Sequence, residues 1–185
     1  EIWSALVEKA FAKLCGSYAA TEWGLNAYGM HYICGGSCTA SWSRLGPSRW
    51  RRSCTVWNGG AECPLDRGLS EGKVEVGDWR DEDEVWAMLR MSMERCYPVA
   101  CGIDREEKAA VGLHTQRLYS VIDVREVPTD QGWTLRMVLL RNPYDTGKWE
   151  GRWSDHSDAW KANPAVRASL EHKPNVGSKF WMSFT

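Results

Sequence analysis

Two segments of the chain carry the apolar spacing of an amphipathic helix. Over residues 3–18 apolar side chains recur three and four positions apart, and Gly16 is a residue type that commonly ends helices. Over residues 81–95 the same spacing returns, and Asp81 stands at the start, where the helix dipole favours an acid. The pattern therefore predicts a helix in each segment, each with one apolar face.

Beyond residue 98 the apolar pattern becomes that of strands. Alternation over 99–103 and apolar runs at 118–124 and 135–140 predict three strands. The sequence Asp-Gln-Gly at 130–132 is a turn, so the last two strands are expected to pair antiparallel. A further apolar run at 180–184 predicts one more strand. The expected order is helix, loops, helix and a mostly antiparallel β unit, which is an α+β arrangement.

Between the predicted helices, residues 35–78 show no helical or strand periodicity. Pairs of glycine and proline punctuate this segment, which predicts loops and short turns. Arginine and tryptophan are interleaved there, and this combination can stack on nucleic-acid bases. The chain has a net charge of -1, however, and lacks the basic surplus of a nucleic-acid binder, so we expect a solvated loop. The residues of this cluster are Trp42, Arg44, Arg49, Trp50, Arg51 and Arg52.

The length and composition of the chain limit the size of its core and argue against a membrane span. With 185 residues, of which 43% are hydrophobic, the chain can bury one sizeable core. No apolar run approaches the ~20 residues that a membrane span requires. The sequence begins at Glu1 without an initiator methionine and has no signal-like pattern, so we expect it to be part of a longer polypeptide.

The cysteines favour a reducing, intracellular location. There are seven, so a purely intramolecular disulfide framework would leave one thiol over. Four of them fall in the stretch rich in glycine, serine and arginine, and four thiolates can bind zinc. Their spacings match no tight pair of zinc knuckles, so unrelated thiols are the expected interpretation and zinc is the alternative. These four are Cys34, Cys38, Cys54 and Cys63.

Several blocks of the chain resemble the calpain family of cysteine peptidases, in family order and over nearly the whole length. WSALVEKAFAKLCGSY at 3–18 resembles the opening helix of the second half of the calpain protease core. GLHTQRLYSV at 112–121 resembles the stretch that carries the catalytic histidine, and LLRNPY at 139–144 the stretch that carries the asparagine. The remaining blocks are KWEGRWSDHSDAW at 148–160 and FWMSF at 180–184.

This resemblance implies a papain-like α+β fold, of which residues 1–185 form the second, β-rich subdomain. An antiparallel sheet or barrel with an N-terminal helix is then expected, and residues 36–78 are the least family-like stretch. In the family this half supplies histidine and asparagine to the cleft. The cysteine nucleophile belongs to the N-terminal half, which is absent from this chain and is therefore an expected partner.

The matched blocks place Arg117 at the position of the catalytic histidine. Arginine has no acceptor nitrogen and stays protonated beyond about pH 12, so it cannot shuttle a proton. Asn142 matches the family's asparagine, and Tyr144 stands where the family has a shielding tryptophan. His114 is the candidate substitute base. On a strand its three-residue offset reverses the face and moves the side chain ~10 Å, unless a bulge at Gln116 returns it to the cleft.

The resemblance also implies a calcium site made of acidic loop residues. Calcium requires several oxygen ligands, most of them carboxylates in high-affinity sites. In this chain Lys148, Gly177 and Lys179 occupy positions of those acids, and only Asp155 keeps its family identity. Glu150, Asp158 and Glu171 could substitute only in a different geometry. We therefore expect neither calcium nor any other cofactor to be bound.

These features together predict a catalytically inactive calpain-like domain, a pseudopeptidase that serves as a structural or protein-binding module. It is similar to the calpain-like proteins of kinetoplastid protists with altered triads, several of which associate with the cytoskeleton or flagellum. That resemblance implies a cytoplasmic location and protein partners, including cytoskeletal ones. One alternative is half of an active calcium-dependent cysteine endopeptidase whose cysteine-bearing half lies outside this chain. Another is a zinc-organised or nucleic-acid-contacting module built on residues 34–63.

Overall fold

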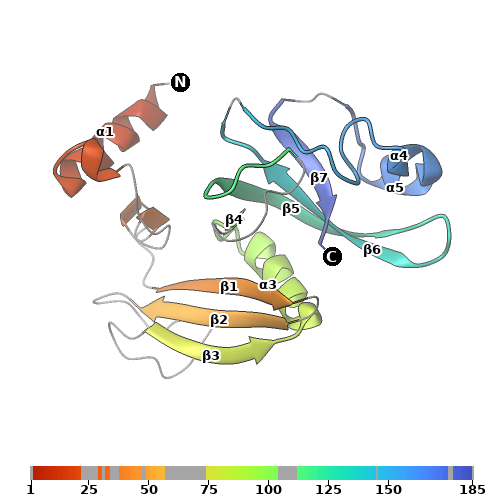
Figure 1. The fold of residues 1–185 in the computed structure, drawn as a ribbon, viewed down its shortest axis with the longest axis horizontal. Coiled ribbons are helices and arrows are strands. Elements are labelled where there is room, and N and C mark those ends of the chain that lie inside the picture. The colour runs from red at the N-terminus through yellow and green to blue at the C-terminus, as the bar shows by residue number, and fades with distance from the viewer. Residues whose placement is uncertain are drawn as a thin grey trace. The chain divides into compact units, whose positions relative to one another are not determined.

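A computed structural model of the chain divides into two compact units, residues 1–85 and 86–185, which are described separately (Figure 1). Among the residues that it describes, no helix has the length and apolar character needed to cross a bilayer. The described residues are 2–21, 29–30, 32–33, 38–46, 49–56, 74–103, 112–144, 146–174 and 177–184.

Helix α1 (Trp3–Cys15) opens the first unit, as the apolar spacing predicts. It ends at Gly16, whose φ of 98° is a left-handed conformation that glycine adopts without a Cβ penalty. A short 3-10 helix, η1 (Ala19–Thr21), follows. Much of the apolar face of α1 is exposed, with Leu6 and Leu14 each at 61%.

Three strands occupy much of the segment for which the sequence predicts loops. They are β1 (Cys38–Gly46), β2 (Arg49–Val56) and β3 (Val74–Arg80), and they form an antiparallel sheet in the order β1-β2-β3. For these residues the loop prediction is wrong. Figure 1 shows the three strands side by side, in orange to yellow.

The register of β1 and β2 explains why the hydrophobic pattern does not reveal them. Trp42 pairs with Arg52 and Arg44 pairs with Trp50, so tryptophan and arginine share one face of the hairpin. The Arg44 guanidinium lies 5.8 Å from the centroid of the Trp50 ring. Because arginine takes the place of an apolar residue in this alternation, no apolar period of two appears in the sequence. The predicted solvated arginine loop is instead a two-stranded ladder.

Helix α3 (Glu82–Glu94) agrees with the predicted second helix. Its start is closed by reciprocal hydrogen bonds: Asp81 Oδ1 accepts the Glu84 N–H at 2.8 Å, and Glu84 Oε2 accepts the Asp81 N–H at 3.2 Å. This arrangement is a capping box with aspartate at its first position. Further along, Trp86 Nε1 donates to Glu126 Oε1 at 2.6 Å.

The second unit contains a four-stranded antiparallel sheet in the order β4-β5-β6-β7. The predicted hairpin is confirmed: β5 and β6 are joined by a turn in which the Thr129 N–H donates to the Trp133 carbonyl at 2.8 Å. In the described residues the sheet stays open, with β4 and β7 at its edges, so it is a sheet and not a barrel. The strands are β4 (Ala100–Gly102), β5 (Leu118–Pro128), β6 (Thr134–Arg141) and β7 (Lys179–Ser183).

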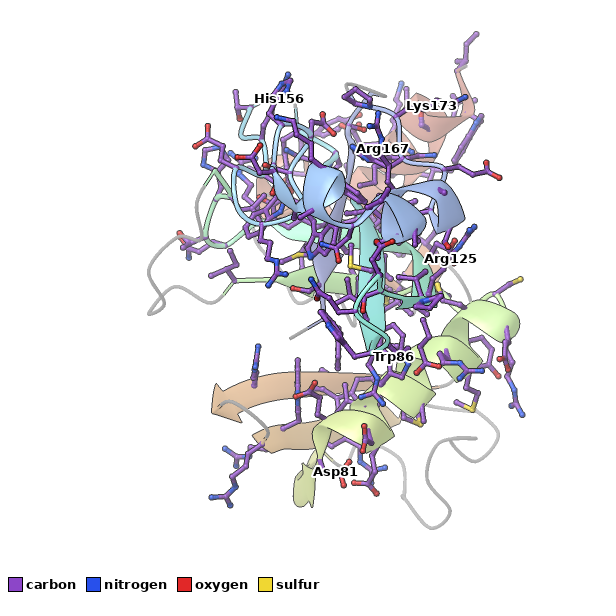
Figure 2. All side chains as sticks on the ribbon, turned by 90° about the vertical axis from the view of Figure 1, so that its right-hand side faces the viewer. Asp81, Trp86, Arg125, His156, Arg167 and Lys173 are labelled. Atoms are coloured by element: carbon purple, nitrogen blue, oxygen red, sulfur yellow. The ribbon has the colours of Figure 1, made fainter. Side chains whose placement is uncertain are left out.

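Both faces of this sheet are covered. A bulge between Val121 and Asp123 moves the following side chains of β5 to the opposite face, because a one-residue slip inverts a strand's facing. On one face the core contains Trp153 and Trp160, together with helices α4 (Ala159–Ala162) and α5 (Pro164–Ser169). On the other face the buried residues are Trp86 (labelled in Figure 2), Leu113, Tyr119, Val121, Val138 and Leu140.

Candidate functional site

The β5–β6 hairpin brings the predicted catalytic positions to one end of the sheet. Arg117 directly precedes β5 and Asn142 directly follows β6, and Ser120 of β5 pairs with Arg141 of β6. Because antiparallel strands place the start of one beside the end of the next, the two residues are close neighbours. The structure thus places Arg117 and Asn142 together at this end of the sheet, and a shared site there stays a prediction.

The Arg117 side chain stacks on Tyr144. Its Cζ lies 4.2 Å from the centroid of the Tyr144 ring, which is cation–π distance. A guanidinium is a cation that offers only hydrogen-bond donors. This end of the sheet therefore has a fixed positive charge and an aromatic ring, and Arg117 supplies no group that accepts a proton.

Asn142 is buried and its amide is used within its own loop. Nδ2 donates to the carbonyls of Thr146 at 3.1 Å and Gly147 at 2.7 Å, while Oδ1 accepts the Tyr144 N–H at 2.9 Å. Both amide protons are thus committed to backbone carbonyls, and only part of the acceptor capacity of Oδ1 remains. In this structure Asn142 holds a loop together.

His114 lies just before a turn at residues 115–116 and not on a strand, so the offset expected for a strand does not apply to it. Gln116 has a φ of 59°, and its N–H donates to the Ile103 carbonyl at 3.0 Å. The His114 N–H donates to Tyr119 Oη at 3.0 Å. The imidazole lies against Gly147: a Cβ built there would sit 2.8 Å from His114 Cδ2 and Nε2. His114 therefore lies against the loop that is held by the hydrogen bonds of Asn142 to Thr146 and Gly147.

Two glycines permit this approach, and neither is among the residues that the sequence predicts for the site. Gly112 has a φ of 81°, and any side chain there would collide with the Lys148 carbonyl. Gly147 has a φ of 80°, and a Cβ there would meet the Gly112 carbonyl at 2.9 Å as well as His114. The sequence signal for these two positions is the glycine itself, because positive φ and close backbone contact both favour a residue without a side chain.

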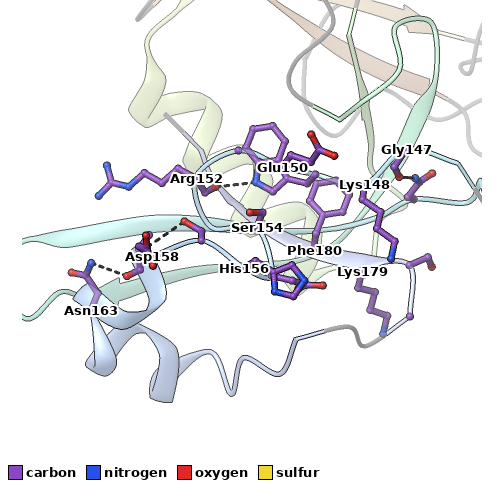
Figure 3. A pocket seen from close by; sticks show the side chains of 18 of the residues that line it. Gly147, Lys148, Glu150, Arg152, Ser154, His156, Asp158, Asn163, Lys179 and Phe180 are labelled. Carbon is purple, nitrogen blue, oxygen red and sulfur yellow. Dashed lines mark hydrogen bonds between the residues drawn. The ribbon is translucent and has the colours of Figure 1, made fainter.

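The positions matched to the family's calcium acids line one pocket of about 1210 Å³, shown from close by in Figure 3. Lys148, Asp155 and Lys179 all belong to its wall. Asp158 also lines it and pairs with Lys161 at 3.0 Å. Glu150 and Gly177 line the pocket too, whereas Glu171 does not. Within the described ranges, no group of three or more His, Cys, Asp or Glu side chains is arranged to hold a metal ion.

Comparison with known proteins identifies the family. A family model described as "Calpain family cysteine protease" matches residues 1–185. The chain belongs to the calpain family. It is 30% identical to the rat (Rattus norvegicus) calpain-1 catalytic subunit over 191 residues, which cover 100% of this chain and 22% of that protein. It is also 28% identical to mouse (Mus musculus) calpain-5, over 100% of the chain and 27% of the relative.

This calpain-family chain thus spans only about a quarter of the length of the curated relatives that it matches, 22% and 27% for these two. Family membership agrees with the α+β order and the antiparallel sheets, which are consistent with a papain-like domain. It also agrees with the sequence blocks that carry the resemblance.

The four cysteines considered for zinc are only partly visible in this calpain-family chain. Cys34 and Cys63 lie outside the described residues. Cys38 and Cys54 lie in β1 and β2, where Cys38 pairs with Val56 and Cys54 pairs with Ala40. The two cysteines therefore occupy neighbouring strands, two register positions apart, and zinc binding there stays a prediction.

Proposed function

We propose that this calpain-family domain is a pseudopeptidase, a structural or protein-binding module that does not cleave peptide bonds. A Cys–His peptidase needs an imidazole that accepts the thiol proton and later returns it to the leaving amine. The observation that carries the proposal is the Arg117 guanidinium stacked on Tyr144 at 4.2 Å, at the position matched to that imidazole. A guanidinium can lower the pKa of a nearby thiol, but it cannot move a proton.

The hydrogen bonds of Asn142 give further support. An orienting residue in a catalytic triad holds the base in one tautomer and direction. Asn142 instead donates both amide protons to Thr146 and Gly147 and accepts from the Tyr144 N–H. It serves the loop in which it sits, and this local role explains why an asparagine remains useful without a histidine to orient.

One alternative function is favoured by a specific contact. The His114 imidazole lies against Gly147, whose carbonyl accepts a hydrogen bond from Asn142. An imidazole so close to the asparagine loop is the residue type that would serve as a base. In this alternative the domain is half of an active calcium-dependent cysteine endopeptidase, with its nucleophile outside the chain and His114 as the proton acceptor.

Casein cleavage by the full-length protein separates these two functions. The pseudopeptidase proposal expects wild type, His114→Ala and the exposed control His156→Ala to cleave no faster than a protein-free blank. The alternative expects measurable cleavage by wild type and His156→Ala, and a loss of about 10²-fold or more in His114→Ala, because general-base catalysis is worth that much. The second pattern would overturn the proposal.

We also propose that this domain does not bind calcium. The pocket wall that carries Asp155 also carries Lys148 and Lys179, and ammonium groups disfavour a divalent cation there. Because a ligand stabilises a fold only if it binds, millimolar calcium should leave the melting temperature of the protein unchanged, while a chelator should not lower it. A rise of several degrees in differential scanning calorimetry would contradict this, provided magnesium at the same concentration gives none.

The proposed partners are the nucleophile-bearing half of the same protease core and other proteins, cytoskeletal ones included, with a cytoplasmic location on the cytoskeleton or flagellum. What supports the first partner is the match to only 22% of the rat calpain-1 catalytic subunit. What supports the second is the resemblance to calpain-like proteins with altered triads.

A further inference from the structure

Lys148 and Lys179 are held side by side, although they lie far apart in the sequence. The residues that precede them are both tied to Asn142. Its backbone N–H donates to the Ser178 carbonyl at 2.8 Å, and its Nδ2 donates to the Gly147 carbonyl at 2.7 Å. One buried residue therefore fixes the backbone immediately before each lysine.

The residues that follow the two lysines are also in contact. The rings of Trp149 and Phe180 stack, with their centroids 6.4 Å apart and their planes inclined by 26°. Contacts before and after each lysine therefore hold the backbone at Lys148 next to the backbone at Lys179. Figure 3 shows the Lys148 and Lys179 side chains at the same end of the pocket, near His156.

Asp155 and Asp158 line the same pocket as the two lysines, but neither carboxylate forms an ion pair with them. Among the residues that the structure describes, neither Lys148 nor Lys179 forms an ion pair. Asp158, on the same pocket, is paired with Lys161 at 3.0 Å. Figure 3 shows the Glu150 carboxylate turned away from both ammonium groups.

Two cationic side chains on one pocket wall, neither of them in an ion pair with a described carboxylate, make the potential there positive, and a bound anion lowers that potential. Each ammonium is a compact charge with three donors, which suits the several oxygens of a tetrahedral anion. A planar carboxylate is matched better by the fork of an arginine, and Figure 3 shows the side chain of Arg152, an arginine of the pocket wall, pointing away from the two lysines. The chemistry therefore favours a phosphate group, whose greater charge also gains more from two cations.

We propose that Lys148 and Lys179 form a binding site for a phosphate monoester, with His156 at its edge. The phosphate can belong to a free small molecule or to a phosphorylated side chain, and both present the same dianionic group. The site goes beyond the proposed function, and it needs neither a nucleophile nor a base. Whether the protein cleaves casein has no bearing on it.

Isothermal titration of the full-length protein with inorganic phosphate and with a phosphoserine peptide tests the site. Wild type should bind at least one of them, and the unphosphorylated peptide should bind more than tenfold weaker. Lys148→Gln and Lys179→Gln should each weaken binding by about tenfold, because each removes one charge-assisted contact. Lys173→Gln is the matched control, since Lys173 is exposed and outside the pocket wall, and it should bind within about twofold of wild type.

The two probes also identify the source of the phosphate. Binding of inorganic phosphate indicates that the anion alone suffices, and binding of the peptide alone indicates a phosphorylated protein partner. Lys148→Arg and Lys179→Arg keep the charge and should retain most of the affinity, which separates lost charge from misfolding. The proposal is wrong if neither probe binds at about 10 mM, or if the Lys148→Gln/Lys179→Gln double variant binds as tightly as wild type.

Discussion

The guanidinium of Arg117 has no nitrogen that accepts a proton, whereas a neutral imidazole has one, so the two groups support different reactions. Stacked on Tyr144 at 4.2 Å, its guanidinium gains a cation–π contact worth about 0.5–1 kcal/mol at an exposed position. That contact stabilises a charged donor where a proton acceptor would be required. The side-chain amide of Asn142 makes its hydrogen bonds within its own loop, to Thr146, Gly147 and Tyr144.

At the same scale, Gly147 tests whether His114 and the asparagine loop are really in contact. Gly147→Ala introduces a methyl group that meets the His114 ring and the Gly112 carbonyl, and it also places alanine at a φ of 80°. Gly132 is a matched control, because its φ is 85° and nothing lies within 4 Å of its added Cβ. Left-handed backbone alone costs alanine about 1–2 kcal/mol, and overpacking adds about 1–3 kcal/mol.

Thermal unfolding should therefore show a larger fall in melting temperature for Gly147→Ala than for Gly132→Ala. Equal losses in the two variants would mean that the close contact with His114 is not present in solution.

At the scale of elements, packed aromatic rings belong to the hydrophobic cluster that joins the α4–α5 region to the sheet. Trp160 of α4 packs edge-on against Trp153 at 4.8 Å and donates from Nε1 to the Ser154 carbonyl at 2.8 Å. The His172 ring, just after α5, stacks on Trp160 with centroids 3.8 Å apart. Burial lowers the pKa of His172, against a raising effect of the Asp155 carboxylate and together with a smaller lowering effect of Arg167.

The lowered pKa of His172 predicts a loss of stability in acid. Because the folded state binds the proton less readily than the unfolded state, this group's stabilisation is complete above the unfolded pKa of about 6.5 and is lost as the pH falls through the folded value. The melting temperature should fall more steeply in wild type than in His172→Phe between about pH 7 and pH 5, since phenylalanine keeps the stack and does not titrate. His156→Phe, at an exposed position, should retain the wild-type slope. Identical slopes for wild type and His172→Phe would contradict this prediction.

Periodicity predicts the elements in which one face is apolar. Helix α1, helix α3 and the β5–β6 hairpin follow such patterns, and all three are confirmed. The β1–β2 ladder escapes prediction because its shared face alternates tryptophan with arginine, which no apolar pattern detects. The contact of His114 with Gly147 escapes it because the contact depends on a close backbone approach at Gly112 and Gly147, two residues far apart in the sequence.

At the scale of the whole molecule, this calpain-family chain covers 22–27% of the length of relatives such as rat calpain-1 catalytic subunit and mouse calpain-5. The sequence blocks alone are enough to indicate the family, because each is specific over several residues. The chemistry at single positions depends on three-dimensional contacts that no block of sequence contains. The folded chain shows that Arg117 stacks on Tyr144 and that the Asn142 amide is hydrogen-bonded within its own loop. It also shows that Lys148 and Lys179 line the same pocket wall.

The central claim is that no residue of this domain shuttles a proton for peptide cleavage. The most direct test is the pH dependence of casein cleavage by the full-length protein between about pH 5 and pH 9, with and without calcium. We expect a rate equal to the protein-free blank at every pH. A bell-shaped profile with a limb near the pKa of an imidazole, abolished by His114→Ala and retained in His156→Ala, would contradict the claim.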